Sequence, residues 1–422
     1  MNIPAKYRML LPGADQALTS FANLLSSMVV LKTAGVSWFG TYSFIMVICV
    51  LIHNSAASIL HGQMMLRISA SKTIVQTRFF RATFIIFTLA FVCFSFVLAA
   101  LFFLFSDQLM AFRWELLFAL IFVYFLGLYE LFKRYLYVVD GQIESFICTL
   151  IYVVVLMVGL VLVYFYSNEA NTVAAVFGLF AVSYLMAALA NKRCIKVLLN
   201  TRSPSLHQTR ILIHGFFKHG KFAFLGQLVT TIQNQGITLF LMFVAGATVV
   251  GYFSLARLLT VPVVVFNMGL TNGFAPKIRV KFKQAGLAIA NAYLTNIARV
   301  SMLFSLLFFA VLALSHHYNF LVMLFPEYPE ASKFLLIWSF VTLLTIYRGW
   351  KTQLFVVSME FYFLLRSGVI ALLVTVAAAL ILYYSTHNFY TVAIAVLVGE
   401  LTLLTILSRK IVSNLAEEHS SS

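Results

Sequence analysis

Twelve stretches of this chain are each long and apolar enough to cross a lipid bilayer as a helix, which takes about 20 residues. The first six lie near residues 15–34, 38–60, 82–105, 114–136, 143–166 and 171–190. The other six lie near 222–245, 249–272, 296–315, 331–357, 364–384 and 389–408. The sequence is 62% hydrophobic and only 10% charged, far from the roughly quarter-charged profile of soluble domains. It therefore predicts an all-α polytopic membrane protein with 12 transmembrane helices.

Basic residues cluster in alternate connections between these stretches. One side holds Lys6, Arg8, Arg67, Lys72, Arg78, Arg81, Lys133, Arg134, the stretch from Lys192 to Lys221, Lys277, Arg279, Lys281, Lys283, Arg366, Arg409 and Lys410. The opposite side holds little beyond Arg113 and Lys333. The positive-inside rule then places both the N and C termini in the cytoplasm. Much of the formal net charge of +16 is topology signal and contact with anionic membrane lipids, so no nucleic acid is expected as a partner.

Little in the sequence indicates an enzyme, a metal site or a cofactor. The cysteines Cys49, Cys93, Cys148 and Cys194 are scattered without metal-ligand or disulfide spacing. No glycine-rich stretch ends in Gly-Lys-Ser/Thr, so nucleotide hydrolysis is not expected. The outer connections are short, which leaves little loop for a catalytic site. Energy would then come from an ion gradient of H⁺ or Na⁺, from the substrate gradient or from a partner, and no catalytic residue is predicted. The N-terminus lacks a compact apolar core with a cleavage site, so no signal peptide is predicted.

The second half of the chain repeats the first. An offset of 211 lays residues 16–44 over 227–255, with Asn23 on Asn234 and Gly35 on Gly246, and an offset of 218 lays 129–139 over 347–357. Repeats displaced by six spans share one membrane orientation, so two six-helix lobes related by pseudo-two-fold symmetry along the membrane normal are expected. Chance identity between apolar helices is the alternative.

The repeat predicts the domain organisation. We expect an N-terminal lobe over 1–190, a basic cytoplasmic linker over 191–221, a C-terminal lobe over 222–410 and a cytoplasmic tail over 411–422. Within the linker, "TRILIHGFFKHGKF" is either an amphipathic interfacial helix or a simple basic connection.

Four of the basic side chains inside the predicted spans are candidates for a cavity. A charge at mid-membrane costs about 2.5–3.5 kcal/mol, so such residues usually face a cavity or a partner. Arg257 is eight residues into its span, about 12 Å deep at ~1.5 Å per residue. Arg348 and Lys351 are three apart, hence on one helical face, and Lys351 repeats Lys133. Lys32 lies toward the outer end of the first span, where its stem can also snorkel. These residues are candidate cavity cations; structural pairing with another helix is the alternative.

Two acidic residues are candidates for ion coupling. Glu130 has Lys133 and Arg134 within one helical turn, so a local ion pair also explains it. Glu400 has no partner nearby in the sequence. It is either a proton-carrying carboxyl or the partner of a cation on another helix.

Neutral polar residues line the same depth of the predicted bundle. Asn23, Gln233, Asn234 and His53 are expected either to line a pathway or to hydrogen-bond between helices. Pro262 frees a backbone carbonyl and can kink its helix.

Two segments carry a resemblance to a known family. "VVGYFSLARLLTVPVVVFNMGLTNGFAPKI" (249–278) is similar to the hairpin between spans seven and eight, and to span eight, of polysaccharide flippases in the multidrug/oligosaccharidyl-lipid/polysaccharide (MOP) exporter superfamily. "VMLFPEYPEASKFLLIW" (322–338) resembles that family's junction before span ten. One departure is that relatives often carry a carboxylate in span seven, where this chain has Gln233, Asn234 and Gln235. This puts any ion coupling through span seven in question.

The resemblance implies an O-antigen type flippase of the bacterial inner (cytoplasmic) membrane. Such a protein moves a polyprenyl-diphosphate-linked oligosaccharide, a surface polysaccharide or lipopolysaccharide repeat unit, from the cytoplasmic to the outer leaflet by alternating access. By this resemblance, Arg257, Arg348 and Lys351 hold the diphosphate or acidic sugars. Polysaccharide polymerase or chain-length machinery would be the protein partners.

Three other functions compete with this one. A MATE-like multidrug or cation antiporter has the same fold, but acidic cavities suit its cationic cargo, and the candidate charges here are mainly basic. A membrane glycosyltransferase or polymerase is disfavoured by the short loops. A major-facilitator transporter is disfavoured because "HGQMMLRISASK" lacks the acidic and glycine positions expected in that family's loop.

Overall fold

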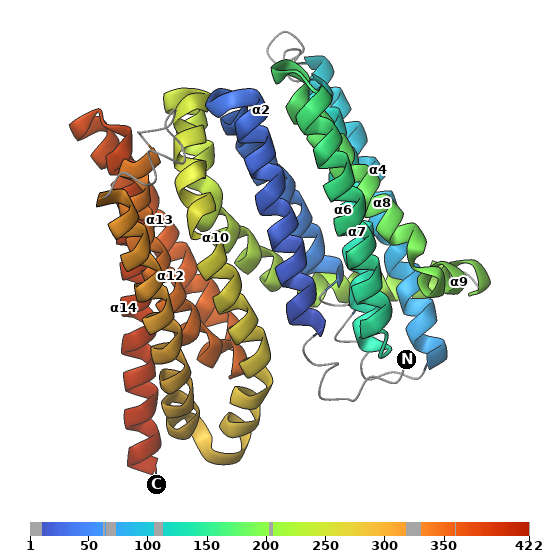
Figure 1. The fold of residues 1–422 in the computed structure, drawn as a ribbon. Coiled ribbons are helices and arrows are strands. Elements are labelled where there is room, and N and C mark those ends of the chain that lie inside the picture. The colour runs from blue at the N-terminus through green and yellow to red at the C-terminus, as the bar shows by residue number, and fades with distance from the viewer. Residues whose placement is uncertain are drawn as a thin grey trace. The chain divides into compact units, whose positions relative to one another are not determined.

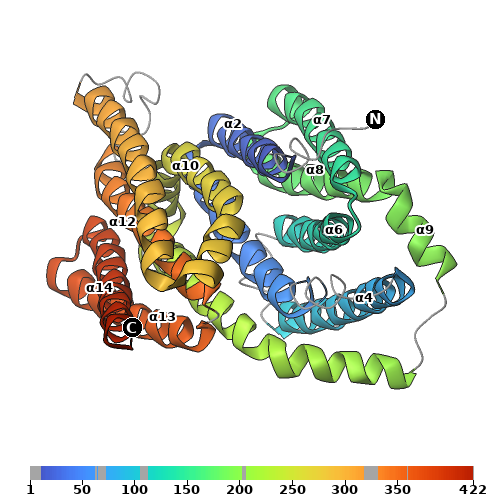
Figure 2. The same ribbon diagram turned by 90° about the horizontal axis from the view of Figure 1, so that it is seen from below.

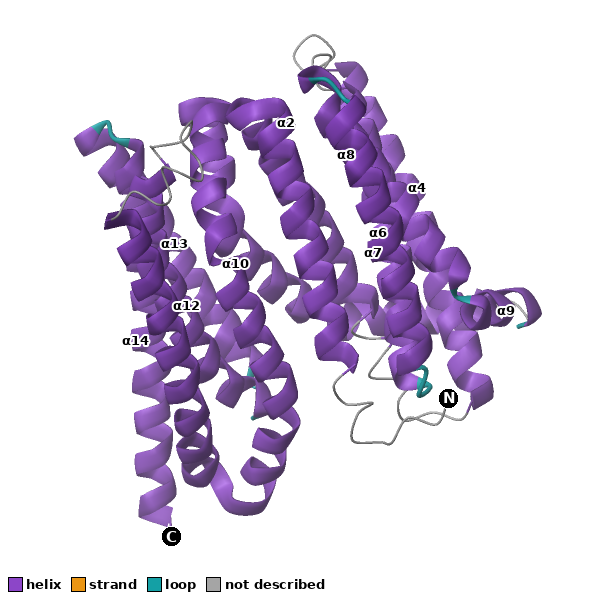
Figure 3. Ribbon diagram, in the orientation of Figure 1, coloured by secondary structure: helices purple, strands orange, loops and turns teal. Residues whose placement is uncertain are grey.

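The computed structural model describes residues 11–61, 64, 73–104, 113–201, 206–317, 331–358 and 360–421. Within these ranges every regular element is a helix (Figure 3). The elements are α2 (Leu11–Ala56), the π-helix η1 (Ala57–His61), α4 (Thr73–Leu104), α6 (Arg113–Val138), α7 (Gln142–Tyr166), α8 (Glu169–Ala190), α9 (Lys192–Asn200), α10 (Leu206–His317), α12 (Ala331–Val357), α13 (Phe361–Thr386) and α14 (Phe389–Ser421). The motif residues 322–330 lie outside the described residues, as do Lys6, Arg8, Arg67 and Lys72.

The described residues contain ten helical segments that are long and apolar enough to cross a membrane. Two of them, Gly13–His61 and Phe224–Thr271, are 49 and 48 residues long, which is twice the ~20 residues that one crossing requires. The chain is therefore an all-α polytopic membrane protein, as predicted. The total of twelve crossings and the cytoplasmic side of the termini stay predictions.

The chain forms two compact units, Met1–Leu228 and Val229–Ser422. In unit 1, α6 packs against α8, α2 and α4, and α7 packs against α2 and α8 (Figures 1 and 2). In unit 2, α14 packs against both α12 and α13 (Figure 1). The basic stretch 191–221 contains α9 and the beginning of α10. The side chains of 202–220, which include most of the predicted amphipathic segment, lie outside the described residues.

Each unit contains a long helical segment that turns sharply at a glycine. Gly35 has φ 78° and ψ 178°, and Gly246 has φ 82° and ψ 176°. This region of backbone space is essentially restricted to glycine. The two residues are the pair that the 211-residue offset aligns. The sequence repeat therefore coincides with a repeated backbone turn.

The later helices of the two units are joined by matching turns. Gly141 N–H donates to the Leu136 carbonyl between α6 and α7, and Glu360 N–H donates to the Phe355 carbonyl between α12 and α13. These pairs correspond at an offset of 219, one residue more than the predicted 218.

The next hairpin repeats as well. The Ser167 and Thr172 hydroxyls lie 2.8 Å apart at the α7–α8 turn, and those of Thr386 and Thr391 lie 2.9 Å apart at the α13–α14 turn. The two units thus share their hairpin geometry.

Large apolar side chains cover the outer faces of many helices. On α7 the exposed set includes Val154, Val158, Val161 and Phe165, spaced three to four residues apart along one face. A continuous apolar face of this kind is unfavourable in water, because exposed apolar patches usually mark contact surfaces. It suits contact with lipid. Several polar and charged side chains are buried inside the units instead, among them Asp15, Lys133, Gln233 and Glu400.

Candidate functional site

Arg257 lies in the α10 segment of unit 2 and contacts only neutral groups among the residues that the structure describes. Its Nη1 donates to Gln235 Oε1 at 2.7 Å and to Thr238 Oγ1 at 3.2 Å. The Cζ atom lies 5.2 Å from the centroid of the Trp338 ring and 5.8 Å from that of Phe253. The guanidinium is thus held by two oxygens and two aromatic faces.

These contacts stabilise the charge without cancelling it. A hydrogen bond to a charged group contributes about 1.5–3 kcal/mol and a cation–π contact about 0.5–2 kcal/mol. No carboxylate of the described residues lies within ion-pair distance of Arg257, which is half-buried. The hydrogen bonds to protein use one nitrogen of a group that carries five N–H donors. The arrangement is a fixed positive charge with capacity for an anionic ligand.

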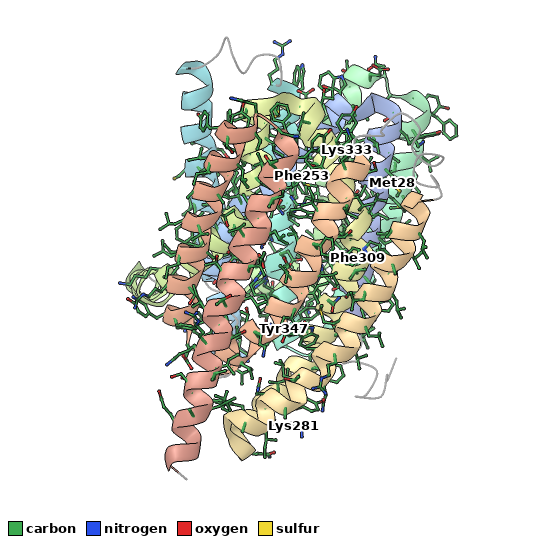
Figure 4. The ribbon with its side chains drawn as sticks, turned by 90° about the vertical axis from the view of Figure 1, so that its left-hand side faces the viewer. Met28, Phe253, Lys281, Phe309, Lys333 and Tyr347 are labelled. Atoms are coloured by element: carbon green, nitrogen blue, oxygen red, sulfur yellow. The ribbon has the colours of Figure 1, made fainter. Side chains whose placement is uncertain are left out.

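The contact with Phe253 shows where the Arg257 charge lies along the length of unit 2. Figure 4 shows Phe253 toward the end of the unit that carries Lys333, whereas Tyr347 lies nearer to the end that carries Lys281. The order agrees with the predicted course of the 249–272 span, which runs from the Lys333 side to the Lys281 side.

Arg348, the second predicted cation, forms an ion pair. Its Nε lies 2.5 Å from Glu400 Oε2, and Gln233 Nε2 donates to Glu400 Oε1 at 3.4 Å. Glu400 is only 1% exposed and Arg348 12%. Of the two roles that the sequence left open for Glu400, the geometry has it paired with a cation on another helix. The charge of Arg348 is therefore already compensated within unit 2.

One short polar segment of α10 contacts Arg257 directly and Arg348 through its partner Glu400. Gln233 contacts Glu400, and Gln235 contacts Arg257, as does Thr238 one turn later. Asn234 between the two glutamines is half-buried. Lys351 is also half-buried, and its Nζ lies 5.7 Å from the centroid of the Tyr347 ring.

In unit 1 the predicted residues Glu130 and Lys133 belong to a larger buried cluster. Lys133 Nζ lies 3.0 Å from Asp15 Oδ2 and 3.7 Å from Glu130 Oε1, and Arg134 Nε lies 3.7 Å from Glu130 Oε2. Both positive charges of this cluster face a carboxylate.

Asp15 anchors the cluster. It is 1% exposed and accepts hydrogen bonds from the hydroxyls of Tyr137, at 2.5 Å, and Thr149. Three helices, α2, α6 and α7, are joined through this one carboxylate.

The remaining predicted residues of unit 1 lie in different surroundings. Asn23 Oδ1 accepts a hydrogen bond from the Tyr152 hydroxyl at 3.0 Å. His53 is half-buried, and its ring centroid lies 6.3 Å from that of His61. Lys32 is exposed on α2.

Several residues of these clusters were not singled out from the sequence. Thr238, Trp338, Asp15 and His61 gave no signal strong enough to distinguish them from ordinary packing residues, except that Asp15 is a lone acid at the start of an apolar stretch. A carboxylate in such a place is costly unless paired, and this could have identified it.

Groups of three or more His, Cys, Asp or Glu that could hold a metal ion do not occur among the described residues. The four cysteines are free thiols; Cys49, Cys148 and Cys194 are buried and Cys93 is exposed.

The fold is similar to that of solved transporter structures over essentially its whole length. An inward-facing structure of a multidrug resistance MATE family transporter of the MOP superfamily has a TM-score of 0.69 at 14% identity, covering 100% of this chain and 97% of that one. The outward-facing structure with the same description has a TM-score of 0.61 at 14% identity, covering 99% and 95%. A MATE structure in the bent conformation has a TM-score of 0.63 at 16% identity, covering 98% and 95%. The fold class is therefore that of MATE and MOP transporters. No protein-family model and no curated protein sequence matches the chain.

Proposed function

We propose that this protein is an alternating-access transporter that moves an anionic, lipid-linked substrate, a polyprenyl-diphosphate-linked oligosaccharide, from the cytoplasmic to the outer leaflet. The observation that carries the proposal is Arg257, a half-buried cation whose protein contacts are all neutral among the described residues. We place the protein in the bacterial inner membrane and expect it to act without catalysing a reaction.

A diphosphate fits the chemistry of this group. Guanidinium binds phosphate through paired, charge-assisted hydrogen bonds, and Gln235 and Thr238 occupy only Nη1. A charge held in a low-dielectric setting attracts an anion far more strongly than one in water. The glycan and diphosphate would pass through the protein while the polyprenyl tail stays in lipid.

The other predicted cations take supporting roles in this proposal. Lys351 would contact the same anion. Arg348 would do so only when Glu400 releases it, which makes Glu400 one candidate for coupling to H⁺ or Na⁺; Glu130 is the other. Anionic membrane lipids and polysaccharide polymerase or chain-length machinery are the partners that we expect.

A multidrug antiporter is the second candidate function. The observation in its favour is the fold similarity to structures described as multidrug resistance transporters. Against it, a cationic drug would be repelled by Arg257, because no carboxylate among the described residues lies beside this side chain.

The test is complementation of a deletion strain with wild type, Arg257→Ala or Arg299→Ala. Arg299 is the matched control, since it lies in the next helical segment of unit 2, beyond the turn at Gly286, is exposed, and among the described residues hydrogen-bonds Asn296 at 3.5 Å. Surface glycan would be measured by gel, and lipid-linked oligosaccharide by extraction. We expect Arg257→Ala to lose surface glycan and accumulate the lipid-linked intermediate in the inner leaflet, while Arg299→Ala displays glycan as wild type does. Normal glycan display with raised drug accumulation in the deletion strain would instead support the antiporter.

A further inference from the structure

The exposed apolar face of α8 ends just before the chain turns into α9. Val182, Met186 and Leu189 are about half exposed and lie four and three residues apart, on one face of the helix. The 22 residues of Glu169–Ala190 extend over about 33 Å at a rise of ~1.5 Å each, which is close to the hydrocarbon thickness of about 30 Å. The residues that follow α8 are therefore expected at the headgroup level of the bilayer.

The helix α9 begins at this level and changes direction. Asn191 separates α8 from α9, and its side chain caps α9 by accepting a hydrogen bond from the Cys194 N–H at 3.1 Å. In Figure 2 the neighbouring α6 is seen nearly end-on, whereas α9 is seen from its side. The helix α9 thus lies crosswise to a spanning helix of its own unit. This is the orientation of a helix that lies along the membrane surface.

One face of α9 is packed against unit 1. Cys194 is completely buried in an apolar cluster with Phe80 and Phe132, and its thiol donates to the Phe132 carbonyl at 3.8 Å. Ile195 and Leu198 are partly buried against the same cluster. The helix is therefore held in place by this face, and its opposite face forms a fixed outer surface.

That outer face carries two lysines and a leucine. Lys192, Lys196 and Leu199 are exposed and lie four and three residues apart, hence on one side of the helix; Leu199 is 77% exposed. No carboxylate of the described residues lies within ion-pair distance of either lysine. Arg193 differs from them, because it lies 3.5 Å from Glu144 and so ties α9 to the beginning of α7. The two lysines keep their charge for an outside partner.

The charges around α9 have a single sign. The stretch 191–221 contains seven Lys and Arg residues and no Asp or Glu, so the partner that it attracts is anionic. Lysines beside an exposed apolar side chain suit a bilayer with anionic headgroups, because the apolar groups enter the interface while the ammonium groups reach the phosphates. The level at which the apolar face of α8 ends favours a bilayer over an acidic protein.

We propose that the exposed face of α9, formed by Lys192, Lys196 and Leu199, binds anionic phospholipid headgroups of the leaflet at which α8 ends. The ammonium groups contact the phosphates, and Leu199 enters the boundary with the acyl chains. Because the buried face fixes α9 to unit 1, lipid bound here holds the end of α8 at the membrane surface. This surface requires that α8 crosses a membrane, and it does not depend on the proposed transport.

The direct test measures the surroundings of α9 in the full-length protein. A bimane fluorophore is attached to Asn200→Cys, at the exposed end of α9, in a Cys93→Ser background, because the other three native cysteines are buried. Quenching by doxyl-labelled lipid and by iodide is compared in nanodiscs of phosphatidylcholine with and without phosphatidylglycerol. We expect phosphatidylglycerol to raise quenching by the lipid and to lower quenching by iodide, and high salt to reverse both changes by screening. A fluorophore that iodide reaches equally in both lipids would overturn the proposal.

A variant with both lysines replaced tests whether their charges carry the effect. An ammonium group at an anionic surface contributes about 5-fold to binding. For Lys192→Gln with Lys196→Gln we expect the phosphatidylglycerol fraction at half-maximal lipid quenching to rise at least about 5-fold. The control is Arg409→Gln with Lys410→Gln, which removes the same charge from α14 and should leave the quenching as in wild type. Equal shifts in the two double variants would show a response to net charge alone and contradict a specific surface on α9.

Discussion

In unit 1 the buried Lys133 faces Asp15 at 3.0 Å, whereas in unit 2 Arg257 faces an amide oxygen, a hydroxyl and two aromatic rings. Both cations lie in helical segments that are long and apolar enough to cross a membrane. One is neutralised by the protein and the other is not. Unit 2 also contains a neutralised pair, Arg348 with Glu400, so the difference belongs to Arg257 and not to unit 2 as a whole.

This comparison separates charges that hold a unit together from a charge that is kept for a ligand. A buried ion pair becomes a liability when one partner is removed, because the other charge is left without compensation. An isolated cation has no such dependence on a single acidic residue. The three tests below are ordered by the loss of stability that we expect, from the largest to the smallest.

Asp15→Asn should be the most destabilising. It removes the negative charge that faces Lys133 and weakens the hydrogen bonds from Tyr137 and Thr149. We expect a loss of about 3–4 kcal/mol of unfolding free energy, read from thermal unfolding of the purified protein. The double variant Asp15→Leu with Lys133→Met should recover much of it. A single variant as stable as wild type would show that the pair is not structural.

Glu400→Gln tests the corresponding pair in unit 2. The amide can still accept from Arg348, but Arg348 then becomes a second cation held by neutral groups. Because Glu400 has fewer bonding partners than Asp15, we expect a smaller loss of about 2 kcal/mol. Binding of pyrophosphate, measured by calorimetry, should tighten. Weaker pyrophosphate binding would argue that Arg348 does not join the anion site when it is released.

Gly35→Ala and Gly246→Ala test whether the two units use the same turn. A Cβ at either position meets no atom within 4 Å, so the cost comes from the backbone alone. We expect losses of about 1–2 kcal/mol each, nearly equal in the two units, in the same unfolding assay. The control is Gly349→Ala, which is helical and also has open space for a Cβ; it should be neutral or slightly stabilising. Clearly different losses of unfolding free energy for Gly35→Ala and Gly246→Ala would show that the two turns are not equivalent.

The membrane helices were predictable because length and apolarity are local properties of the sequence. The repeat was predictable at Gly35 and Gly246 because both the sequence offset and the backbone requirement for glycine mark the same positions. At the turn after α6 the hydrogen bonds of the two units correspond at an offset of 219, whereas the predicted offset of 218 covers residues 129–139 before that turn and stays a prediction.

The partners of the charged residues were not predictable in the same way. Asp15 is 118 residues from Lys133, and Arg348 is 52 residues from Glu400. Which residues form ion pairs therefore depends on how the helices pack, and not on their spacing in the sequence. The sequence therefore left Glu400 with two possible roles. It identified Arg257 from its depth in the span, but the neutral contacts that give this residue its character depend on Trp338 and Thr238, which look like ordinary core residues.

The most direct test of the account is transport by the purified protein in proteoliposomes, comparing wild type, Arg257→Gln and Arg299→Gln with a fluorescent polyprenyl-diphosphate glycan. We predict that Arg257→Gln loses only about 1–2 kcal/mol of unfolding free energy, because the lost hydrogen bonds and aromatic contacts are offset by no longer burying a charge, and no acid is left unpaired. We also predict that it transports about 10- to 100-fold more slowly through loss of a charged contact to the substrate. Arg299→Gln should transport as wild type does. Wild-type transport by Arg257→Gln would contradict the claim that this cation is the anion site.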